Sequence, residues 1–192
     1  MASAWFYDLF MSPLERLGLS RARRRLVANL RGRVLELGAG TGLLFSAYEG
    51  APAVAIDIDA SGFARARRRD PRVALVQADA QALPFRDGAF DAVVETLSLC
   101  SVPDPAAALR EARRVLKPGG ELRLLEHVLP PGPVLARAFR LLAPAWLRIS
   151  GGCHLERRSA LLVGPAGFAV TSARENARGI VAEIRARKNG EA

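Results

Sequence analysis

Five short apolar segments constrain the fold of this chain more than any other feature. They are Arg33–Leu37, Ala53–Ile56, Val73–Val76, Asp91–Val94 and Glu121–Val128. Helical segments separate several of them, including Ser61–Arg69 and Asp104–Leu116. Short apolar strands that alternate with helices are typical of a parallel sheet with helices on both faces. The sequence therefore predicts an α/β fold with a doubly wound, mostly parallel sheet.

The C-terminal part of the chain follows a different pattern. Residues 168–174 and 180–187 alternate polar and apolar side chains on either side of a turn at 176–179. Such alternation around a turn predicts an antiparallel hairpin. Added to five parallel strands, this C-terminal hairpin gives a seven-stranded sheet.

Several helical segments are expected outside the sheet. Residues 3–17 have apolar side chains at helical spacing, and a basic helix is predicted over 20–30. The stretch 133–149 is amphipathic, but Pro144 is expected to interrupt any helix there. Residues 155–164 are predicted to form a short helix.

The length of 192 residues fits one domain, 1–192. Within it we expect N-terminal helices over 1–31 and a lid over the substrate from 128–160. No apolar run reaches the roughly 18 residues of a membrane helix, and the N-terminus does not resemble a secretory signal. Cys100 and Cys153 lie far apart in the sequence, so we expect no disulfide framework, no metal site and a cytoplasmic location.

The net charge of +9 bears on the choice of partners. Most of the excess lies after residue 96, where 15 basic and 8 acidic residues occur. Such a balance is compatible with nucleic acid, anionic lipid or an acidic substrate. Only two of the basic residues are lysines, however, and richness in Ala, Gly, Pro and Arg is typical of genomic base composition. We expect no nucleic-acid partner and at most weak peripheral membrane contact; the oligomeric state stays open.

A glycine-rich loop follows the first strand, within residues 34–42, and is expected to lead into a helix. Glycines let the backbone turn sharply and approach a ligand closely. Gly38, Gly40 and Gly42 are spaced Gly-x-Gly-x-Gly, which differs from the Gly-x-Gly-x-x-Gly of dinucleotide-binding folds. Glu36 lies two residues before the first glycine, where it would repel a pyrophosphate but suit the cationic amino end of methionine.

Two further carboxylates follow strands. Asp57 ends the second strand, 15 residues after Gly42, and can accept hydrogen bonds from ribose hydroxyls. NAD-binding proteins use the same arrangement, so Asp57 by itself leaves the ligand open. Asp79 follows the third strand, where a carboxylate can accept from an adenine amino group.

Taken together, these motifs resemble the class I methyltransferases that depend on S-adenosylmethionine (SAM), over most of residues 33–128. The matching segments are Glu36–Gly42, Asp57, Asp79 with Ala80, and Arg114–Gly120. Within that family, Leu83–Phe85 and Asp87–Asp91 are similar to the small-molecule subgroup of ubiquinone/menaquinone C-methyltransferases. Residues 151–168 are similar, over a short and loosely spaced stretch, to membrane-associated thiol methyltransferases.

The resemblance implies a Rossmann-like fold, SAM as cofactor and S-adenosylhomocysteine as product. It also implies that Gly38, Ala39 and Gly40 pack against the methionine part of SAM. Asp57 is expected on the ribose, Ile58 against the adenine ring, and Asp79 at the adenine amino group. The full expected cofactor set is Glu36, Gly38, Ala39, Gly40, Gly42, Asp57, Ile58, Asp79, Ala80 and Glu95.

Methyl transfer is an in-line displacement that mainly requires donor and acceptor to be aligned. A general base is needed only when the acceptor holds a proton at neutral pH. His127, beside Glu126 at the end of the fifth strand, is the candidate base; packing of His127 within the strand end is an equal alternative. Aromatic residues near 1–10 and 139–146 favour a small hydrophobic acceptor, such as a quinone-like ring or a thiol. A phospholipid amine acceptor and a non-catalytic nucleotide-binding module are the alternatives.

Overall fold

The computed structural model describes residues 4–48, 50, 53–130, 132–150, 152–176 and 180–190. Its strands are β1 (Val34–Leu37), β2 (Ala53–Asp57), β3 (Ala74–Gln77), β4 (Phe90–Thr96), β5 (Leu116–His127), β6 (Phe168–Asn176) and β7 (Val181–Lys188). Its α-helices are α1 (Ala4–Leu14), α2 (Ser20–Val27), α3 (Phe63–Arg69), α4 (Pro105–Val115) and α5 (Pro133–Ser150). Shorter helical turns are η1 (Glu15–Leu19), η2 (Phe45–Ala47), η3 (Ala60–Gly62), η4 (Leu99–Ser101) and η5 (Ser159–Leu162).

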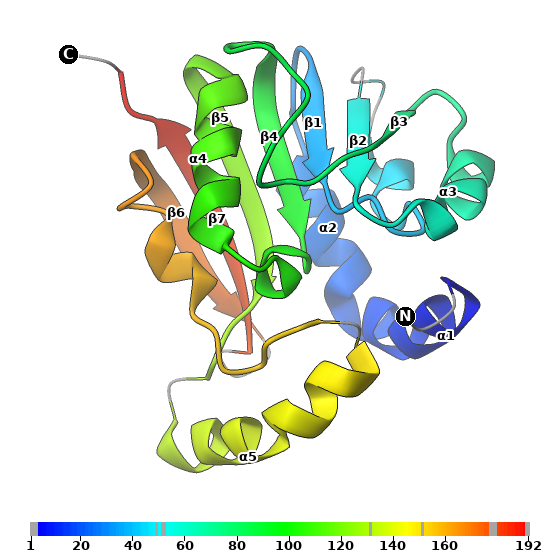
Figure 1. The fold of residues 1–192 in the computed structure, drawn as a ribbon, viewed down its shortest axis with the longest axis vertical. Coiled ribbons are helices and arrows are strands. Elements are labelled where there is room, and N and C mark those ends of the chain that lie inside the picture. Colours follow the sequence, from blue (N-terminus) through cyan, green and yellow to red (C-terminus); the bar gives the residue numbers. More distant parts are fainter. Residues whose placement is uncertain are drawn as a thin grey trace.

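The strands form one seven-stranded sheet in the order β3-β2-β1-β4-β5-β7-β6 (Figure 1). The pairs from β3 to β5 are parallel, whereas β7 runs antiparallel to both β5 and β6. The predicted sheet and its C-terminal hairpin are therefore confirmed. The strand order reverses between β1 and β4, which is where a doubly wound sheet opens a ligand crevice at the carboxyl ends of its strands.

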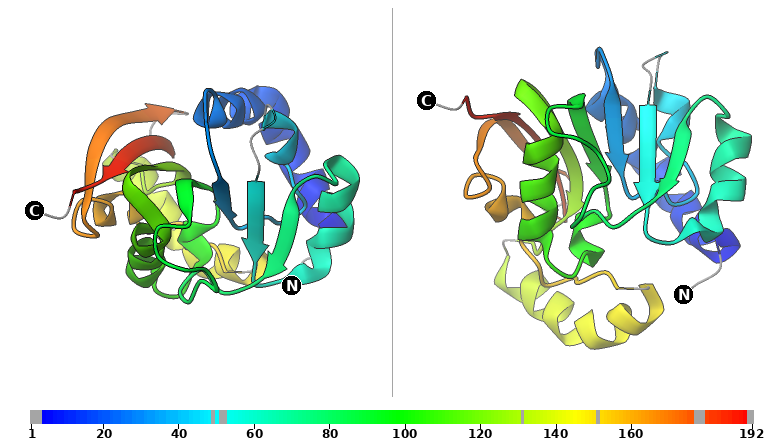
Figure 2. Two further views of the ribbon diagram at one scale, coloured as in Figure 1. Left: turned by 90° about the horizontal axis from the view of Figure 1, so that it is seen from above. Right: turned by 45° about the horizontal axis from the view of Figure 1, so that its top comes forward.

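Helices cover both faces of the sheet (Figure 2). On one face, Leu109 and Val115 of α4 belong to a buried cluster with side chains such as Leu124 of β5. On the other face, Leu26 of α2 and Phe63 of α3 join a second buried cluster. Because apolar layers cover both faces of the sheet, the sequences of the central strands are almost continuously apolar.

The start of α4 follows from local capping. The Asp104 side chain accepts hydrogen bonds from the backbone N–H groups of Ala106 and Ala107 at 2.9 and 3.0 Å. Pro105 occupies the first turn, where its missing N–H costs nothing. After α4 the chain enters β5 at Leu116, which pairs with Phe90, so this strand begins earlier than the predicted Glu121.

The helix α5 corrects the expectation that Pro144 interrupts the segment. Residues 133–150 form one α-helix with Pro144 inside it. The helix curves across the edge at which β1 and β4 end (Figure 1). Pro144 is exposed, so water can satisfy the carbonyl that the proline leaves without a helical partner.

Two other predicted helices are each a single 3₁₀ turn. The glycine loop leads only into η2, and the helix expected over 155–164 is η5. Few residues separate Gly42 from the start of β2, so a longer helix and its return loop do not fit between them. In the described parts of the chain, no helix has both the length and the apolar character needed to cross a membrane.

Candidate active site

The glycine loop connects β1 to η2 at the carboxyl edge of the sheet. Gly38, Gly40 and Gly42 have φ values of 77°, 49° and 79°, in the region that favours glycine. A Cβ on Gly38 would lie 2.4 Å from the Ser98 side chain, and one on Gly42 would lie 2.9 Å from the Ala66 backbone. A Cβ on Gly40 would meet nothing within 4 Å. Gly40 therefore borders open space, whereas the two outer glycines permit close packing.

Asp57 holds this loop from the end of β2. Its Oδ2 accepts a hydrogen bond from the Gly40 N–H at 2.8 Å, and its Oδ1 accepts from the Asp59 N–H at 3.0 Å. Next to it, Ile58 is 64% exposed, which leaves its side chain available to a flat apolar ligand. The structure thus brings Asp57 and Ile58 together beside Gly40, and their contacts with a cofactor stay a prediction.

Asp79 lies at the neighbouring strand end. The Ala78 N–H donates to the Asp57 carbonyl at 3.0 Å, which joins the loop after β3 to the end of β2. The Asp79 carboxylate accepts from the Gln81 N–H at 2.8 Å and from the Gln81 side-chain amide at 3.0 Å. Asp79 and Ala80 are both partly exposed at this edge.

A small cavity of about 20 Å³ lies between the glycine loop and α2. Glu36 is only 1% exposed there, and the Tyr48 hydroxyl donates to its Oε2 at 2.8 Å. Burial raises the pKa of Glu36 to about 8, although the Tyr48 hydrogen bond and the Arg23 charge act in the opposite direction. The cavity is lined by Arg23, Glu36, Gly38, Ala39, Gly40, Thr41, Leu43 and Thr96.

Arg23 brings a buried positive charge to this cavity. Its side chain pairs with Glu15 at 3.0 Å and donates to the Thr96 hydroxyl at the end of β4. The cavity therefore holds one cationic and one acidic group, as a zwitterionic ligand end requires. No sequence signal singles out Arg23, because it is one arginine of several in a basic helix.

Asp8 of α1 was also missed. Its carboxylate accepts from the Thr41 hydroxyl of the glycine loop at 2.6 Å and from Arg65 and Arg69 of α3 at 2.8 and 2.9 Å. Asp8 thus joins α1 to both the loop and α3. No local sequence signal marks it, since 33 residues separate Asp8 from Thr41.

Glu95 and Glu126 lie side by side at the ends of β4 and β5. The Leu99 N–H donates to Glu95 Oε1 at 2.9 Å and to Glu126 Oε1 at 3.1 Å. The Ser159 hydroxyl donates to the second Glu126 oxygen at 3.2 Å. Burial, together with the neighbouring Glu95 charge, raises the pKa of Glu126 well above its ordinary value, and burial also raises that of Glu95. This pair holds η4 and η5 against the strand ends.

His127, the last residue of β5, faces α5. Its ring stacks on Phe139 with centroids 5.5 Å apart and an interplanar angle of 6°. Burial lowers the pKa of His127, so the imidazole is neutral at pH 7. Its Nδ1 is buried and has no hydrogen-bond partner within the described residues.

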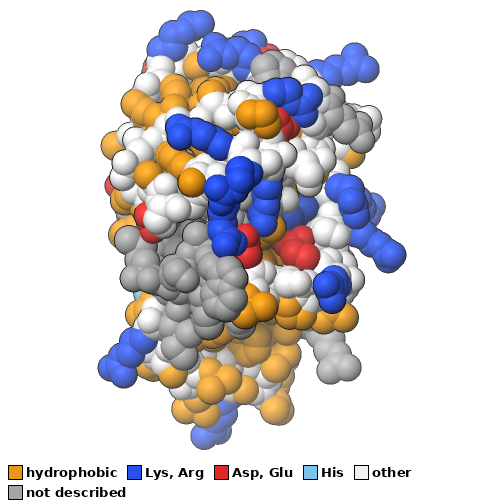
Figure 3. Space-filling model, turned by 90° about the vertical axis from the view of Figure 1, so that its right-hand side faces the viewer, with side chains coloured by type: hydrophobic (Ala, Val, Ile, Leu, Met, Phe, Trp, Pro, Cys, Tyr) orange, Lys and Arg blue, Asp and Glu red, His pale blue; other side chains and the backbone are white. Residues whose placement is uncertain are grey.

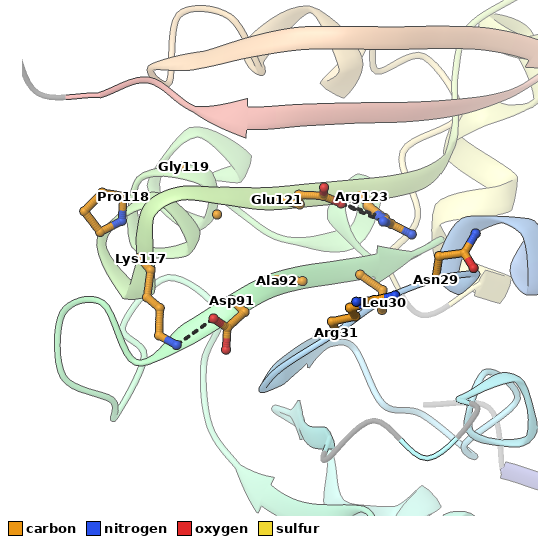
Figure 4. A pocket seen from close by; sticks show the side chains of 11 residues that line it. Asn29, Leu30, Arg31, Asp91, Ala92, Lys117, Pro118, Gly119, Glu121 and Arg123 are labelled. Atoms are coloured by element: carbon orange, nitrogen blue, oxygen red, sulfur yellow. Dashed lines mark hydrogen bonds and ion pairs between the residues drawn. The ribbon is translucent and has the colours of Figure 1, made fainter.

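A larger cavity of about 310 Å³ lies elsewhere, at the amino ends of the central strands (Figure 4). Lys117 pairs with Asp91 at 2.6 Å on its wall, and Arg123 pairs with Glu121 at 2.6 Å. Because the glycine loop and the predicted cofactor carboxylates lie at the opposite edge, this cavity is separate from the candidate site. Among the described residues, no group of three His, Cys, Asp or Glu side chains is placed to hold a metal ion.

The chain is similar in sequence to known proteins. Residues 35–124 match the family model described as a methyltransferase domain. A demethylmenaquinone methyltransferase from Clavibacter sepedonicus is 43% identical over 126 residues, covering 62% of this chain and 51% of the relative. Thiol S-methyltransferase TMT1B from Rattus norvegicus is 37% identical over 135 residues, covering 66% of this chain and 55% of the relative. This chain therefore spans about half the length of these two relatives.

A solved structure shows the same fold. The S-adenosylmethionine-dependent methyltransferase from Mesorhizobium loti superposes with a TM-score of 0.69 at 19% identity, covering 87% of this chain and 96% of the other. The predicted fold and the resemblance to quinone methyltransferases are both confirmed. Residues 35–124 thus match a methyltransferase domain, and the chain is similar in sequence to the demethylmenaquinone methyltransferases.

Proposed function

We propose that this chain transfers the methyl group of SAM to a small hydrophobic acceptor, either a quinone-like ring or a thiol. The observation that carries the proposal is the cavity beside Gly40, where the buried carboxyl of Glu36 and the buried guanidinium of Arg23 both line the wall. The methionine end of SAM carries an ammonium and a carboxylate, which match these two side chains. SAM supplies a methyl group already activated by its sulfonium.

The remaining cofactor contacts follow from the strand ends. Asp57 accepts from the ribose hydroxyls, Ile58 lies against the adenine ring, and Asp79 accepts from the adenine amino group. Glu95, Gly42 and Ala80 shape the walls around them. Asp57 keeps its hydrogen bond to the Gly40 N–H in the same arrangement, so ligand binding and loop conformation depend on one carboxylate.

The acceptor site is proposed at the carboxyl edge beneath α5, with residues 128–160 as its lid. His127 and its partner Phe139 present an apolar, aromatic surface there. Because its imidazole is neutral, His127 Nδ1 can accept the proton of a quinol or thiol as the methyl group is transferred. Glu126 acts through η4 and η5 instead, as a positioning residue.

Calorimetry with SAM, S-adenosylhomocysteine and NAD tests the cofactor assignment. We expect binding of the first two and none of NAD. Gly40→Val is the matched variant, because its side chain would enter the open space in which the ligand is proposed to lie. It should lose binding while the cooperative unfolding transition is kept.

A screen of thiols and quinols with labelled SAM then identifies the acceptor. Binding of SAM without methyl transfer to any compound would favour a non-catalytic module.

The role of His127 has its own test once an acceptor is known. His127→Gln should lower kcat and leave the affinity for S-adenosylhomocysteine unchanged, because the base acts on the acceptor alone. Phe139→Leu serves as the control for packing against α5. Equal losses in turnover and cofactor affinity in His127→Gln would assign the side chain to packing.

A phospholipid amine is the second candidate acceptor, and α5 favours it. This helix carries three arginines and no acidic residue, and Val134, Leu141 and Leu142 on it are exposed. Figure 3 shows hydrophobic side chains gathered at the lower end of the molecule, where α5 lies. Transfer to phosphatidylethanolamine in mixed micelles, with none to quinols or thiols, would select this acceptor.

A further inference from the structure

Two cysteines far apart in the sequence meet beside the candidate acceptor site. Cys100 lies in η4, directly after β4, and Cys153 lies three residues after the end of α5. Their Sγ atoms are 3.4 Å apart, although 53 residues separate them along the chain. Both are free thiols; Cys100 is buried and Cys153 is half-buried. Neither has a role in the cofactor site described above.

We propose that Cys153 is an oxidation site for hydroperoxides and that Cys100 resolves it into a disulfide, which fixes the segment after α5 to η4. The backbone around the two thiols is already held in place. The His154 N–H donates to the Cys100 carbonyl at 3.2 Å, and the Arg157 guanidinium donates to the same carbonyl at 3.3 Å and to that of Val102. A disulfide requires an S–S distance of about 2.05 Å, so the two side chains must approach by little more than an ångström.

The environment makes the two thiols unequal. Cys100 donates its S–H to Cys153, and this hydrogen bond is the largest factor that lowers the pKa of Cys153, to about 7. Trp146 and the Arg157 charge also lower it, whereas burial and Glu156 raise it. The same hydrogen bond, with burial and the charges of Glu126 and Glu95, raises the pKa of Cys100 well above its ordinary value. Cys153 is therefore the thiol of the pair that ionises first, and Cys100 stays protonated.

The chemistry proceeds in two balanced steps. The Cys153 thiolate attacks the outer oxygen of the hydroperoxide, the O–O bond breaks, and an alkoxide or hydroxide leaves to take up a proton. The resulting sulfenic acid is attacked by Cys100 sulfur; the S–O bond breaks, and water leaves with the proton of Cys100. The two thiols lose two electrons, and the peroxide gains them.

The disulfide would act on the elements that border the acceptor site. Residues 152–157 continue from α5, and η4 adjoins Ser98, which packs against Gly38 of the glycine loop. A bond between them removes the freedom of the α5 end to move away from the sheet edge. We therefore expect the disulfide to slow the exchange of acceptor molecules at the site. This effect rests on the proposed function, whereas formation of the disulfide does not.

Peptide mapping of the full chain after hydrogen peroxide treatment tests the proposal. Trypsin cleavage places Cys100 in peptide 87–110 and Cys153 in peptide 149–157. We expect these two peptides to be joined, with both thiols lost together, and to separate after dithiothreitol. Because the thiolate fraction of a group with a pKa of about 7 rises from about one tenth to about nine tenths between pH 6 and pH 8, the rate should rise roughly tenfold.

Matched variants distinguish the roles of the two cysteines. Cys100→Ser should trap Cys153 as sulfenic or sulfinic acid, and Cys153→Ser should leave Cys100 unmodified on the same timescale. Hydrogen exchange of residues 146–157 should slow on oxidation and recover on reduction. Oxidation of Cys153 in the unaltered chain with Cys100 still free, bonds only between molecules, or unchanged exchange would each overturn the proposal. Calorimetry with S-adenosylhomocysteine is run separately, so a failure of the proposed function is seen apart from a failure of the bond.

Discussion

Burial and the charge of a bound ligand have opposite effects on the protonation of the Glu36 carboxyl. Without ligand, burial holds its pKa at about 8, so the carboxyl is mostly protonated at pH 7. The ammonium of S-adenosylhomocysteine would favour the ionised form, so binding below pH 8 should release a proton. Affinity should then rise by up to about tenfold per pH unit from about pH 6 to pH 7.5. Calorimetry in two buffers with different ionisation enthalpies measures both effects.

Glu36→Gln is the control for this pH dependence. It keeps an oxygen for the Tyr48 hydroxyl and cannot titrate. The variant should bind with an affinity that hardly changes with pH and without proton release. The same pH profile in both proteins would place the titrating group elsewhere; Glu95, whose pKa is also raised by burial, is then the next candidate.

Asp57 holds the glycine loop and is the proposed ligand of the ribose. Asp57→Ala should weaken SAM binding by about 1.5–3 kcal/mol, the range for hydrogen bonds to a charged group. Asp57→Asn keeps an acceptor for the Gly40 N–H and removes the charge, so it should lose less. Calorimetry gives the affinities, and unchanged affinity in Asp57→Ala would remove this residue from the site.

At the scale of elements, α1 is attached to the core through Asp8. Asp8→Asn should lower the free energy of unfolding by roughly 1–2 kcal/mol, because Thr41, Arg65 and Arg69 lose a charged acceptor. Urea denaturation measures this, and limited proteolysis should show earlier cleavage in α1.

A surface ion pair provides the control for Asp8. Arg110 lies 3.6 Å from Asp104 and both side chains are more than half exposed. Arg110→Gln should change stability by only a few tenths of a kcal/mol. If Asp8→Asn behaves like this control, Asp8 does not hold α1 in place.

At the scale of the whole molecule, net charge and exposed apolar surface determine how strongly the protein binds to a lipid membrane. The net charge of +9 and the three arginines of α5 should draw it to anionic vesicles at low salt. Co-sedimentation should disappear at physiological salt, because screening acts within about 8 Å. Binding that resists salt and is lost in a Leu141→Ser, Leu142→Ser variant would show instead that α5 inserts between lipids.

The strands and the glycine loop could be predicted because their signals are local. Apolar runs between turn residues identify strands, and the spacing of Gly38, Gly40 and Gly42 with Glu36 indicates the kind of ligand end. Asp57 follows a strand directly, so parallel pairing alone brings it to the loop. The family match and the fold agree with these local patterns.

Only the tertiary structure decided which distant side chains meet. Asp8 reaches Thr41 across 33 residues, and Cys100 reaches Cys153 across 53. The protonation of Glu36 depends on burial, which no single stretch of sequence contains. Pro144 reads as a helix breaker locally, yet α5 continues through it because that side of the helix faces water. Local pattern therefore determined the strands and the glycine loop, whereas packing determined charge states, contacts between elements and the course of α5.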